Sequence, residues 1–142
     1  MRKARRRAFP ARYESLAAIG HFVARAAEQA GFDECGVYQV ELAVDEACSN
    51  IIEHAYGGEG RGVIECSCRV HDEGLTVELR DQGLPFDPGS VPQPNLGANI
   101  EERTLGGLGL FFIHNLMDEV EFDFESEAGN ILTLVKRKEK NC

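Results

Sequence analysis

The hydrophobic residues recur with a helical period in the first part of the chain. Over Ser15–Ala30 and again over Cys35–Ala55 they stand three or four positions apart, which is typical of helices with one buried face. In the second segment the apolar stripe consists of Val40, Val44, Ala47 and Ile51. Gly31 follows the first segment and Gly57-Gly58 the second, and glycine commonly ends helices. The pattern therefore predicts two amphipathic helices.

Later segments alternate between hydrophobic and polar residues, as strands with one buried face do. They predict two hairpins, Gly62–Val70 with Leu75–Asp81 and Val120–Glu125 with Ile131–Lys136. Turn residues separate the strands of each hairpin, at His71–Gly74 and at Ser126–Asn130. The arm formed by residues 1–9 contains a further predicted edge strand, Arg2–Phe9.

Residues 84–105 show no periodicity and hold four of the five prolines. Irregular segments of this length are uncommon in compact domains and often cover a functional site, so we expect a lid here. The segment runs into Gly106–Gly109 and then into a helical stretch, Leu110–Met117. The order of elements predicts an α+β fold, a two-layer sandwich with helices on one face of a mixed, mostly antiparallel sheet. We expect one domain over residues 1–142.

Charge and composition narrow the functional classes. The formal net charge is −9, and residues 13–135 carry 23 acidic but only five basic side chains. Such a surface disfavours direct binding to nucleic acid. It could attract a basic protein partner, and the alternative, at least as common, is that the charge only keeps the protein in solution. No apolar run reaches the length of a membrane span, and no apolar stretch follows the basic N-terminus, so we expect a cytoplasmic protein that is not bound to a membrane. Cys66 and Cys68 alternate with core residues, which predicts that these thiols fill the core.

Glu46 and Asn50 stand one turn apart in the second predicted helix. At about 100° per residue their side chains lie within about 40° of each other, on the flank of the apolar stripe. A carboxylate and a carboxamide so placed can accept a proton and hold a hydrated Mg²⁺ ion. The alternative interpretation is a solvated helix edge, the commoner role of polar residues at such a border.

Asp81 ends the apolar row of its predicted strand. Alternation places it on the core face, where a carboxylate needs hydrogen-bond donors. Two positions on, Gly83 would let a ligand approach the backbone closely. The glycines of Gly106–Gly109 precede a helix, where free N–H groups suit a phosphate. Each feature alone is common, but their set and order predict a nucleotide site.

Three groups of residues resemble the motifs of the GHKL ATPases, and in detail their branch of anti-sigma-factor serine kinases of the RsbW type. The groups are Glu46-Ala47-Cys48-Ser49-Asn50, Asp81-Gln82-Gly83 with Phe86-Asp87, and Gly106-Gly107-Leu108-Gly109-Leu110 followed by Leu116-Met117-Asp118-Glu119-Val120. The resemblance implies a Bergerat ATP-binding fold that uses ATP and Mg²⁺. It also implies a serine/threonine kinase whose substrate is an anti-anti-sigma protein of the STAS type. Such kinases sequester a sigma factor and usually form homodimers.

The resemblance further implies roles for single residues. Glu46 matches the general base, Asn50 the Mg²⁺ ligand, and Asp81, with Gly83 beside it, the aspartate that recognises adenine. Thr133 matches a threonine near the adenine. The remaining ATP-binding residues implied are Gly106, Gly107, Leu108, Gly109 and Leu110.

One position departs from the pattern. Some members carry a basic lid residue directly before the glycine loop, whereas this chain has Leu105 there and its nearest arginine is Arg103. A second hypothesis is therefore a non-catalytic or weakly catalytic ATP-binding module that sequesters a protein partner. A third, the ATP-binding half of a histidine kinase, is weaker because no helix pair with a phospho-acceptor histidine precedes the domain.

Overall fold

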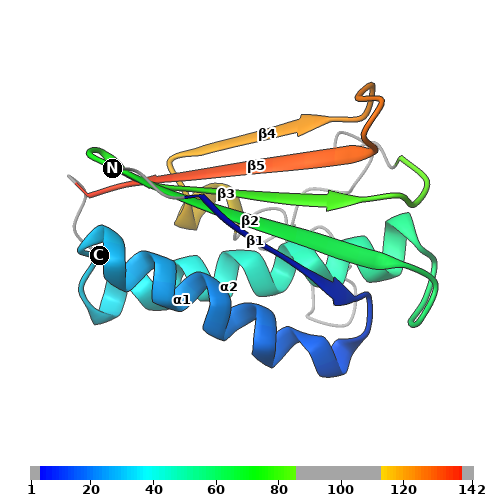
Figure 1. Ribbon diagram of the computed structural model, residues 1–142, viewed down its shortest axis with the longest axis horizontal. Coiled ribbons are helices and arrows are strands. Elements are labelled where there is room, and N and C mark those ends of the chain that lie inside the picture. The colour runs from blue at the N-terminus through cyan, green and yellow to red at the C-terminus, as the bar shows by residue number, and fades with distance from the viewer. Residues whose placement is uncertain (1–3, 86–112, 139–142) are drawn as a thin grey trace, which may run out of the picture.

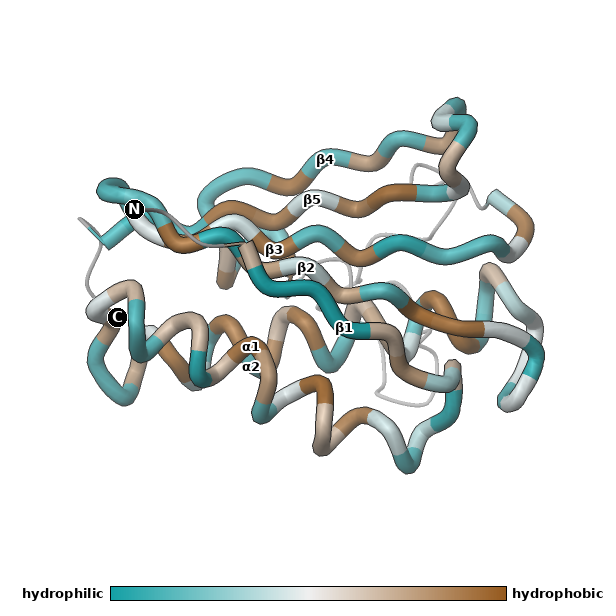
Figure 2. Tube along the Cα trace, viewed as in Figure 1, coloured by the Kyte–Doolittle hydropathy of each residue, from teal (hydrophilic) through white to brown (hydrophobic). Residues whose placement is uncertain are grey.

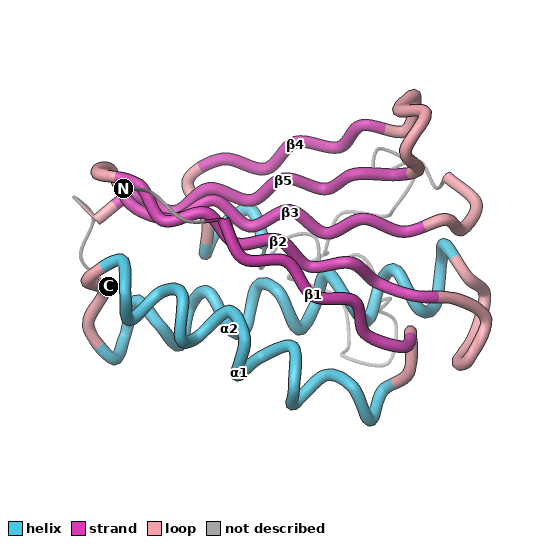
Figure 3. The backbone as a smooth tube through the Cα atoms, viewed as in Figure 1, coloured by secondary structure: helices cyan, strands magenta, loops and turns pink. Residues whose placement is uncertain are grey.

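The computed structural model describes residues 4–85 and 113–138, which form a layer of helices packed on one face of a sheet (Figure 1 and Figure 3). The sheet has five strands in the order β1-β2-β3-β5-β4. The strands are β1 Ala4–Pro10, β2 Val63–His71, β3 Gly74–Asp81, β4 Glu119–Asp123 and β5 Asn130–Arg137. The helices are α1 Leu16–Ala30 and α2 Glu34–Asn50, with a 3-10 turn η1 Tyr13–Ser15 before α1 and a π-helical turn η2 Ile51–Ala55 after α2.

Every pairing between the described strands is antiparallel. The predicted α+β sandwich is confirmed, and both predicted hairpins form, but no parallel pairing of the expected mixed sheet occurs within residues 4–85 and 113–138. The predicted N-terminal strand is also confirmed, because β1 lies at the edge of the sheet and pairs with β2. The β4–β5 hairpin contributes the other edge strand, with β5 inserted beside β3.

Local capping explains where the helices begin and end. Asp33 precedes α2, and its Oδ1 accepts a hydrogen bond of 2.8 Å from the Gly36 N–H. An aspartate at this position satisfies one of the free amides of the first turn. Gly31 follows α1 with φ of 96°, and its N–H donates to the carbonyls of Ala27 and Glu28. Glycine adopts this left-handed conformation without steric cost, so the first helix ends where the sequence predicts.

The second helix differs from its prediction in the last turn. The sequence predicts one helix over Cys35–Ala55, whereas α2 ends at Asn50 and continues as η2. In this wider turn the Tyr56 N–H donates to the Ile51 carbonyl at 3.0 Å. Because a π turn accommodates an extra residue, the chain rotates directly after Asn50, and Ile51 and Ala55 are both buried. Such turns often occur at functional sites.

The core lies between the helices and the inner face of the sheet, and hydrophobic residues recur along the elements of both layers (Figure 2). The apolar stripe of the second helix is buried as predicted, at Val40, Val44, Ala47 and Ile51. Cys66 and Cys68 are buried free thiols of the core, which confirms their predicted packing role. Among the described residues, no helix combines the length and the apolar character needed to cross a bilayer.

Candidate nucleotide site

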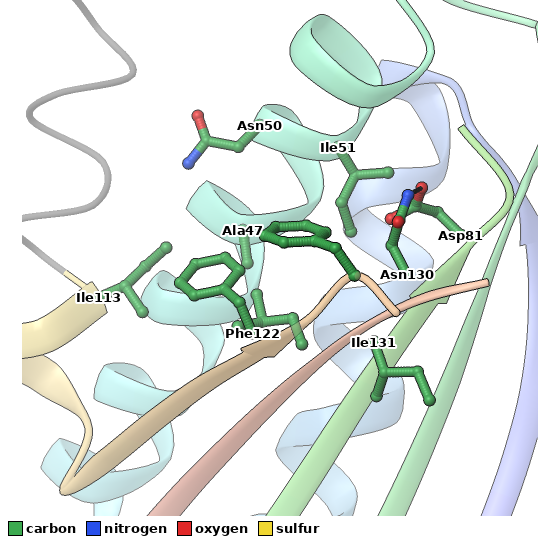
Figure 4. A pocket seen from close by; sticks show the side chains of 10 residues that line it. Ala47, Asn50, Ile51, Asp81, Ile113, Phe122, Asn130 and Ile131 are labelled. Carbon is green, nitrogen blue, oxygen red and sulfur yellow. Dashed lines mark hydrogen bonds between the residues drawn. The ribbon is translucent and has the colours of Figure 1, made fainter. Parts of the chain in front are cut away.

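A pocket lies between the end of α2 and the strands β3, β4 and β5 (Figure 4). Its lining is mainly apolar, with three buried polar exceptions that come from different elements. The lining residues are Ala47, Asn50, Ile51, Asp81, Ile113, Phe122, Phe124, Asn130, Ile131 and Leu132. Two of the predicted site residues, Asn50 and Asp81, are therefore brought to one pocket although a helix and a strand carry them.

Asp81 is the last residue of β3 and is only 4% exposed. Its Oδ1 accepts two hydrogen bonds, from Asn130 Nδ2 at 2.8 Å and from the Gly83 N–H at 2.9 Å. No donor among the described residues reaches Oδ2. Burial raises the pKa of Asp81 above its ordinary value, and the bonds from Asn130 and Gly83 oppose the rise. The side chain thus offers a buried acceptor to a ligand in the pocket.

Asn130 is a pocket residue that the sequence did not reveal. It is 6% exposed and stands opposite Asp81 in the β3–β5 register. Its Nδ2 donates to Asp81 and also to the Gly83 carbonyl, at 3.0 Å. One indication of this contact is visible in the sequence, because a carboxylate that faces the core at Asp81 needs a hydrogen-bond donor. Only the pairing of β3 with β5 identifies which residue supplies it.

Gly83 packs closely against the backbone of η2. A Cβ atom at this position would lie 2.5 Å from the Ala55 carbonyl oxygen. The neighbouring Leu84 N–H donates to the same carbonyl at 2.8 Å. Close packing of two backbone segments therefore accounts for a glycine here, in addition to the ligand approach expected from the sequence. This contact joins the strand that holds Asp81 to the helix that holds Asn50.

Asn50 occupies the other end of the pocket from Asp81, and its carboxamide points away from Asp81 (Figure 4). The residue is 5% exposed, yet its side chain makes no hydrogen bond within residues 4–85 and 113–138. A buried amide without a partner costs free energy, so its presence indicates a ligand group. The amide oxygen is a hard donor that suits Mg²⁺. No cluster of three or more acidic, histidine or cysteine ligands accompanies it in the described part of the chain.

Glu46 lies one turn before Asn50 on α2 and is half-buried. Burial, followed by the charges of Asp45 and Glu53, raises the pKa of Glu46 above its ordinary value. A carboxylate with a raised pKa is a stronger proton acceptor. Glu46 does not line the pocket itself. It stands outside the pocket, one turn from the Asn50 end.

Thr133 requires a correction, because β5 does not bring it to the pocket. The residues that face the helices from this strand are the buried Asn130, Leu132 and Leu134. Alternation turns Thr133 to the opposite, outer face, in register with Glu78 and Glu121. Thr133 is not among the residues that line the pocket. Asn130 takes the position that the sequence analysis gave to Thr133.

Two aromatic residues of β4 and its C-terminal end form another part of the lining that sequence reasoning missed. The rings of Phe122 and Phe124 stack with centroids 5.7 Å apart and planes 24° apart. Residues two positions apart on a strand share a face, so the spacing was visible in the sequence. Their relation to the pocket was not, because it depends on the β4–β5 hairpin.

The remaining predicted site residues lie outside the described residues. They are Arg103, Leu105 and the glycine-loop residues Gly106, Gly107, Leu108, Gly109 and Leu110, together with Phe86-Asp87 and most of the expected lid.

The segment after the glycine loop is described from Ile113 onward. Residues 113–116 are helical, and the Leu116 carbonyl accepts a bond of 2.9 Å from Lys136 Nζ. Asp118 Oδ2 accepts from the Arg137 N–H at 2.6 Å. The Leu116–Val120 motif therefore fixes this helical segment, whose Ile113 lines the pocket, to β5.

The arrangement suits one class of ligand. An apolar slot with one carboxylate oxygen that accepts no bond from the described residues can bind a flat heterocycle that carries an amino group. The buried amide at the other end can face a cation and the phosphates that bind it. A nucleotide whose base lies at Asp81 and whose phosphates lie toward Asn50 satisfies both ends.

Comparison with known proteins agrees with this geometry. Residues 9–136 match the family described as the histidine kinase-like ATPase domain. The chain is 32% identical to the serine-protein kinase RsbW of Listeria innocua over 111 residues, which cover 75% of this chain and 71% of the relative. It is 32% identical to the protein of the same name from Halalkalibacterium halodurans, over 89% of this chain and 78% of the relative. For the serine-protein kinase RsbW of Bacillus velezensis the identity is 30%, over 89% and 81%. The chain belongs to the histidine kinase-like ATPase domain family.

Proposed function

We propose that this member of the histidine kinase-like ATPase domain family is an ATP-dependent serine/threonine protein kinase. The observation that carries the proposal is the buried Asp81 carboxylate, whose Oδ1 is occupied by Asn130 and Gly83 while Oδ2 has no donor among the described residues. An apolar pocket with one such acceptor selects a base with an exocyclic amino group. The relatives are named serine-protein kinases, which supports phosphoryl transfer as the reaction.

Adenine is the base that fits. Its amino group would donate to Asp81 Oδ2, and the apolar residues of the slot would cover its faces. Guanine presents a carbonyl oxygen at the same position, and two acceptors facing each other leave both unpaired. Asp81 in its ionised form therefore favours ATP over GTP.

Asn50 would lie at the phosphate end of the bound nucleotide. Its buried carboxamide makes no hydrogen bond to the described residues and fits Mg²⁺, and the magnesium ion when bound would neutralise charge on the phosphates. The chain's own part is to offer this oxygen from a rigid helix, directly before the π turn η2.

Glu46 would accept the proton of the attacking hydroxyl group. It precedes Asn50 by one turn, so a substrate serine or threonine that reaches the phosphate end meets this carboxylate. Its raised pKa improves proton acceptance. Phosphoryl transfer needs little beyond alignment, a proton acceptor and charge neutralisation. Proton acceptance and phosphate binding are thus assigned to separate side chains of one helix.

We propose that the protein substrate is an anti-anti-sigma protein of the STAS type, and that the chain acts as a homodimeric anti-sigma factor in a partner-switching circuit in the cytoplasm. The resemblance of the motifs to the anti-sigma-factor kinases supports this circuit, and the relatives named serine-protein kinase RsbW support the kinase part of it. The acidic central region, with 23 acidic and five basic side chains over residues 13–135, supports a basic protein partner such as a sigma factor.

A phosphorylation assay tests the proposal. The purified chain is incubated with ATP, Mg²⁺ and a STAS-domain protein from the same genome, and phosphoserine or phosphothreonine is identified on the STAS protein by mass spectrometry. Thermal unfolding with and without Mg²⁺-ADP tests the nucleotide site separately. An unchanged unfolding temperature with ADP would remove the ATP-site assignment. Binding without any transfer would remove the kinase assignment alone.

Leu105 favours a second candidate function. It stands where some members carry a basic lid residue, and a leucine cannot contact the γ-phosphate with a charge. The alternative is a weakly catalytic or non-catalytic ATP-binding module that sequesters its partner. Tight partner binding in the presence of ATP, with no phosphate on the partner after hours, would support this alternative.

A further inference from the structure

Asn130 is the first residue of β5 and the only other polar residue beside Asp81 at this end of the described pocket. We propose that Asn130 is a positioning residue for nucleotide recognition: its carboxamide fixes Asp81 so that Oδ2 is presented to the amino group of the base. The proposal rests on the proposed nucleotide site. It adds a residue that contributes to recognition through Asp81.

The geometry of the carboxamide carries the proposal. Nδ2 donates one bond to Asp81 Oδ1 at 2.8 Å and one to the Gly83 carbonyl at 3.0 Å. Both N–H bonds of the amide are therefore used, and a planar amide held at two points cannot rotate freely. The amide is 6% exposed, so water does not replace these bonds easily. Asn130 thereby clamps Asp81 to the turn that follows it.

The same contacts make the two carboxylate oxygens of Asp81 unequal in their hydrogen bonding. Oδ1 receives a second bond from the Gly83 N–H at 2.9 Å, so both of its donors come from the protein. Oδ2 receives none from the described residues. A ligand amino group therefore finds one acceptor in one orientation. Preorganised polar groups of this kind give specificity because they need no rearrangement when the ligand binds.

The hydrogen bond from Asn130 also affects the ionisation of the Asp81 carboxyl group. The bond from Asn130 stabilises the ionised form of Asp81, and it opposes the rise in pKa that burial causes. Every other described residue that lines the pocket is uncharged and does not titrate, whether it comes from α2, η2, β4, β5 or the helical segment at Ile113. Arg80 lies on the outer face of β3, where it contacts Glu65 and Glu78. Among the described residues, Asn130 and Gly83 are thus the groups that lower the pKa of Asp81.

The test replaces the carboxamide with an apolar group of similar size, in Asn130→Leu. In the ligand-free protein, the carboxyl carbon of Asp81 is followed by NMR against pH. The pKa of Asp81 in the variant should be about one pH unit higher than in the wild type, or more. Thr133→Val, on the outer face of the same strand, is the matched control and should leave this pKa unchanged.

The second readout is the Kd for ADP, measured by calorimetry at pH 8 and pH 6. Asn130→Leu should bind ADP more weakly than the wild type, and the loss should be larger at pH 6 than at pH 8, because Asp81 has the higher pKa in the variant. The wild type should change much less between the two values. A purely structural role would weaken binding equally at both and would leave the pKa of Asp81 unaltered.

Several results would overturn the inference. One is an unchanged pKa of Asp81 in Asn130→Leu, and another is a loss of ADP binding that does not depend on pH. If Asn130→Leu does not fold, Asn130→Ala removes the amide without adding another donor and gives the same readouts. If the wild type itself binds no ADP, the proposed function fails and recognition by Asn130 fails with it. The NMR titration would then still show whether Asn130 controls Asp81.

Discussion

The carboxylate of Asp81 and the carboxamide of Asn130, 49 positions apart in the chain, are joined by a buried hydrogen bond of 2.8 Å. The two residues are direct partners in the antiparallel register of β3 and β5. This bond lies at the end of the pocket where the base would bind, and it leaves one oxygen of Asp81 for a ligand. The chemistry of the site depends on this pairing.

Replacing Asp81 by asparagine should abolish adenine binding without unfolding the protein. In Asp81→Asn the remaining oxygen can still accept from Asn130 and Gly83, but the amide then presents N–H donors to the pocket. We expect the ADP-dependent rise in unfolding temperature to disappear. Without ligand the variant should be as stable as the wild type at pH 7, since a buried charge is removed.

The control for this prediction is Asp123→Asn, which changes an exposed aspartate of β4. It should keep the full response to ADP. An undiminished response in Asp81→Asn would show that the base binds elsewhere.

Glu46→Gln should separate catalysis from binding. The amide keeps the shape of the side chain but accepts a proton poorly, so phosphoryl transfer should fall by about 10²- to 10⁴-fold. The Kd for ADP should stay within about threefold, because Glu46 does not line the pocket. Both are measured by single-turnover phosphorylation and calorimetry.

Glu53→Gln is the matched control on the next turns of the same helix. Glu53 is exposed, and its Oε1 accepts from the Tyr13 hydroxyl at 2.9 Å. Transfer should fall much less in this variant than in Glu46→Gln, because Glu53→Gln removes only one of the charges that raise the pKa of Glu46. Normal transfer by Glu46→Gln would mean that another group accepts the proton.

Two glycine-to-alanine changes should have opposite effects on stability. In Gly83→Ala the new methyl group would lie 2.5 Å from the Ala55 carbonyl oxygen, so the backbone must shift, at a cost of about 1–3 kcal/mol. In Gly20→Ala nothing lies within 4 Å of the new methyl group. Alanine within α1 should stabilise the protein by about 0.5–1 kcal/mol.

Urea unfolding of both variants measures these free energies. Gly83→Ala should also weaken ADP binding, because the Gly83 N–H bonds to Asp81. Equal stability of Gly83→Ala and the wild type would contradict the close approach of β3 and η2.

The ligand-free protein should become more stable as the pH falls from 7 toward 4.5. Burial raises the pKa of Asp45 and Asp81 above 3.8, and burial with the charges of Asp45 and Glu53 raises that of Glu46 above 4.5. The folded state therefore binds more protons than the unfolded chain in this range. These groups contribute stability that is present below the ordinary pKa values and is lost as the pH rises through the raised ones.

Urea unfolding at several pH values checks this dependence. In the variant with both Asp81→Asn and Glu46→Gln, the free energy of unfolding should change less with pH than in the wild type. ADP affinity should show the opposite trend and decrease on acidification, because protonated Asp81 offers a poorer acceptor. A steeper profile in the double variant would contradict the raised pKa values.

Lys136→Met should destabilise the protein by about 1–3 kcal/mol, because it removes a donor to a partly buried carbonyl. Lys136 is 5% exposed, and its Nζ donates to the Leu116 carbonyl. Lys138→Met, two positions on and exposed, should change stability little. Thermal unfolding compares the two, and equal effects would show that the Lys136 bond does not stabilise the fold.

The sequence by itself determined the local structure. Helical and alternating periods located α1, β2, β3 and β5 to within one or two residues. They also placed Asp81 on the core face, because the side-chain period of a strand is fixed. The motifs named Asn50 as a site residue, and the structure shows it in the lining of the pocket, while its role toward Mg²⁺ stays a prediction.

Tertiary structure alone decided which distant residues meet. The pairing of β3 with β5 identified Asn130 as the partner of Asp81, whereas Thr133 does not line the pocket. The bond from the Leu84 N–H to the Ala55 carbonyl likewise joins the π turn to the segment after β3, 29 positions on in the chain. Strand register and backbone packing are long-range contacts, set by the whole hydrophobic core, and no periodicity within one segment contains them.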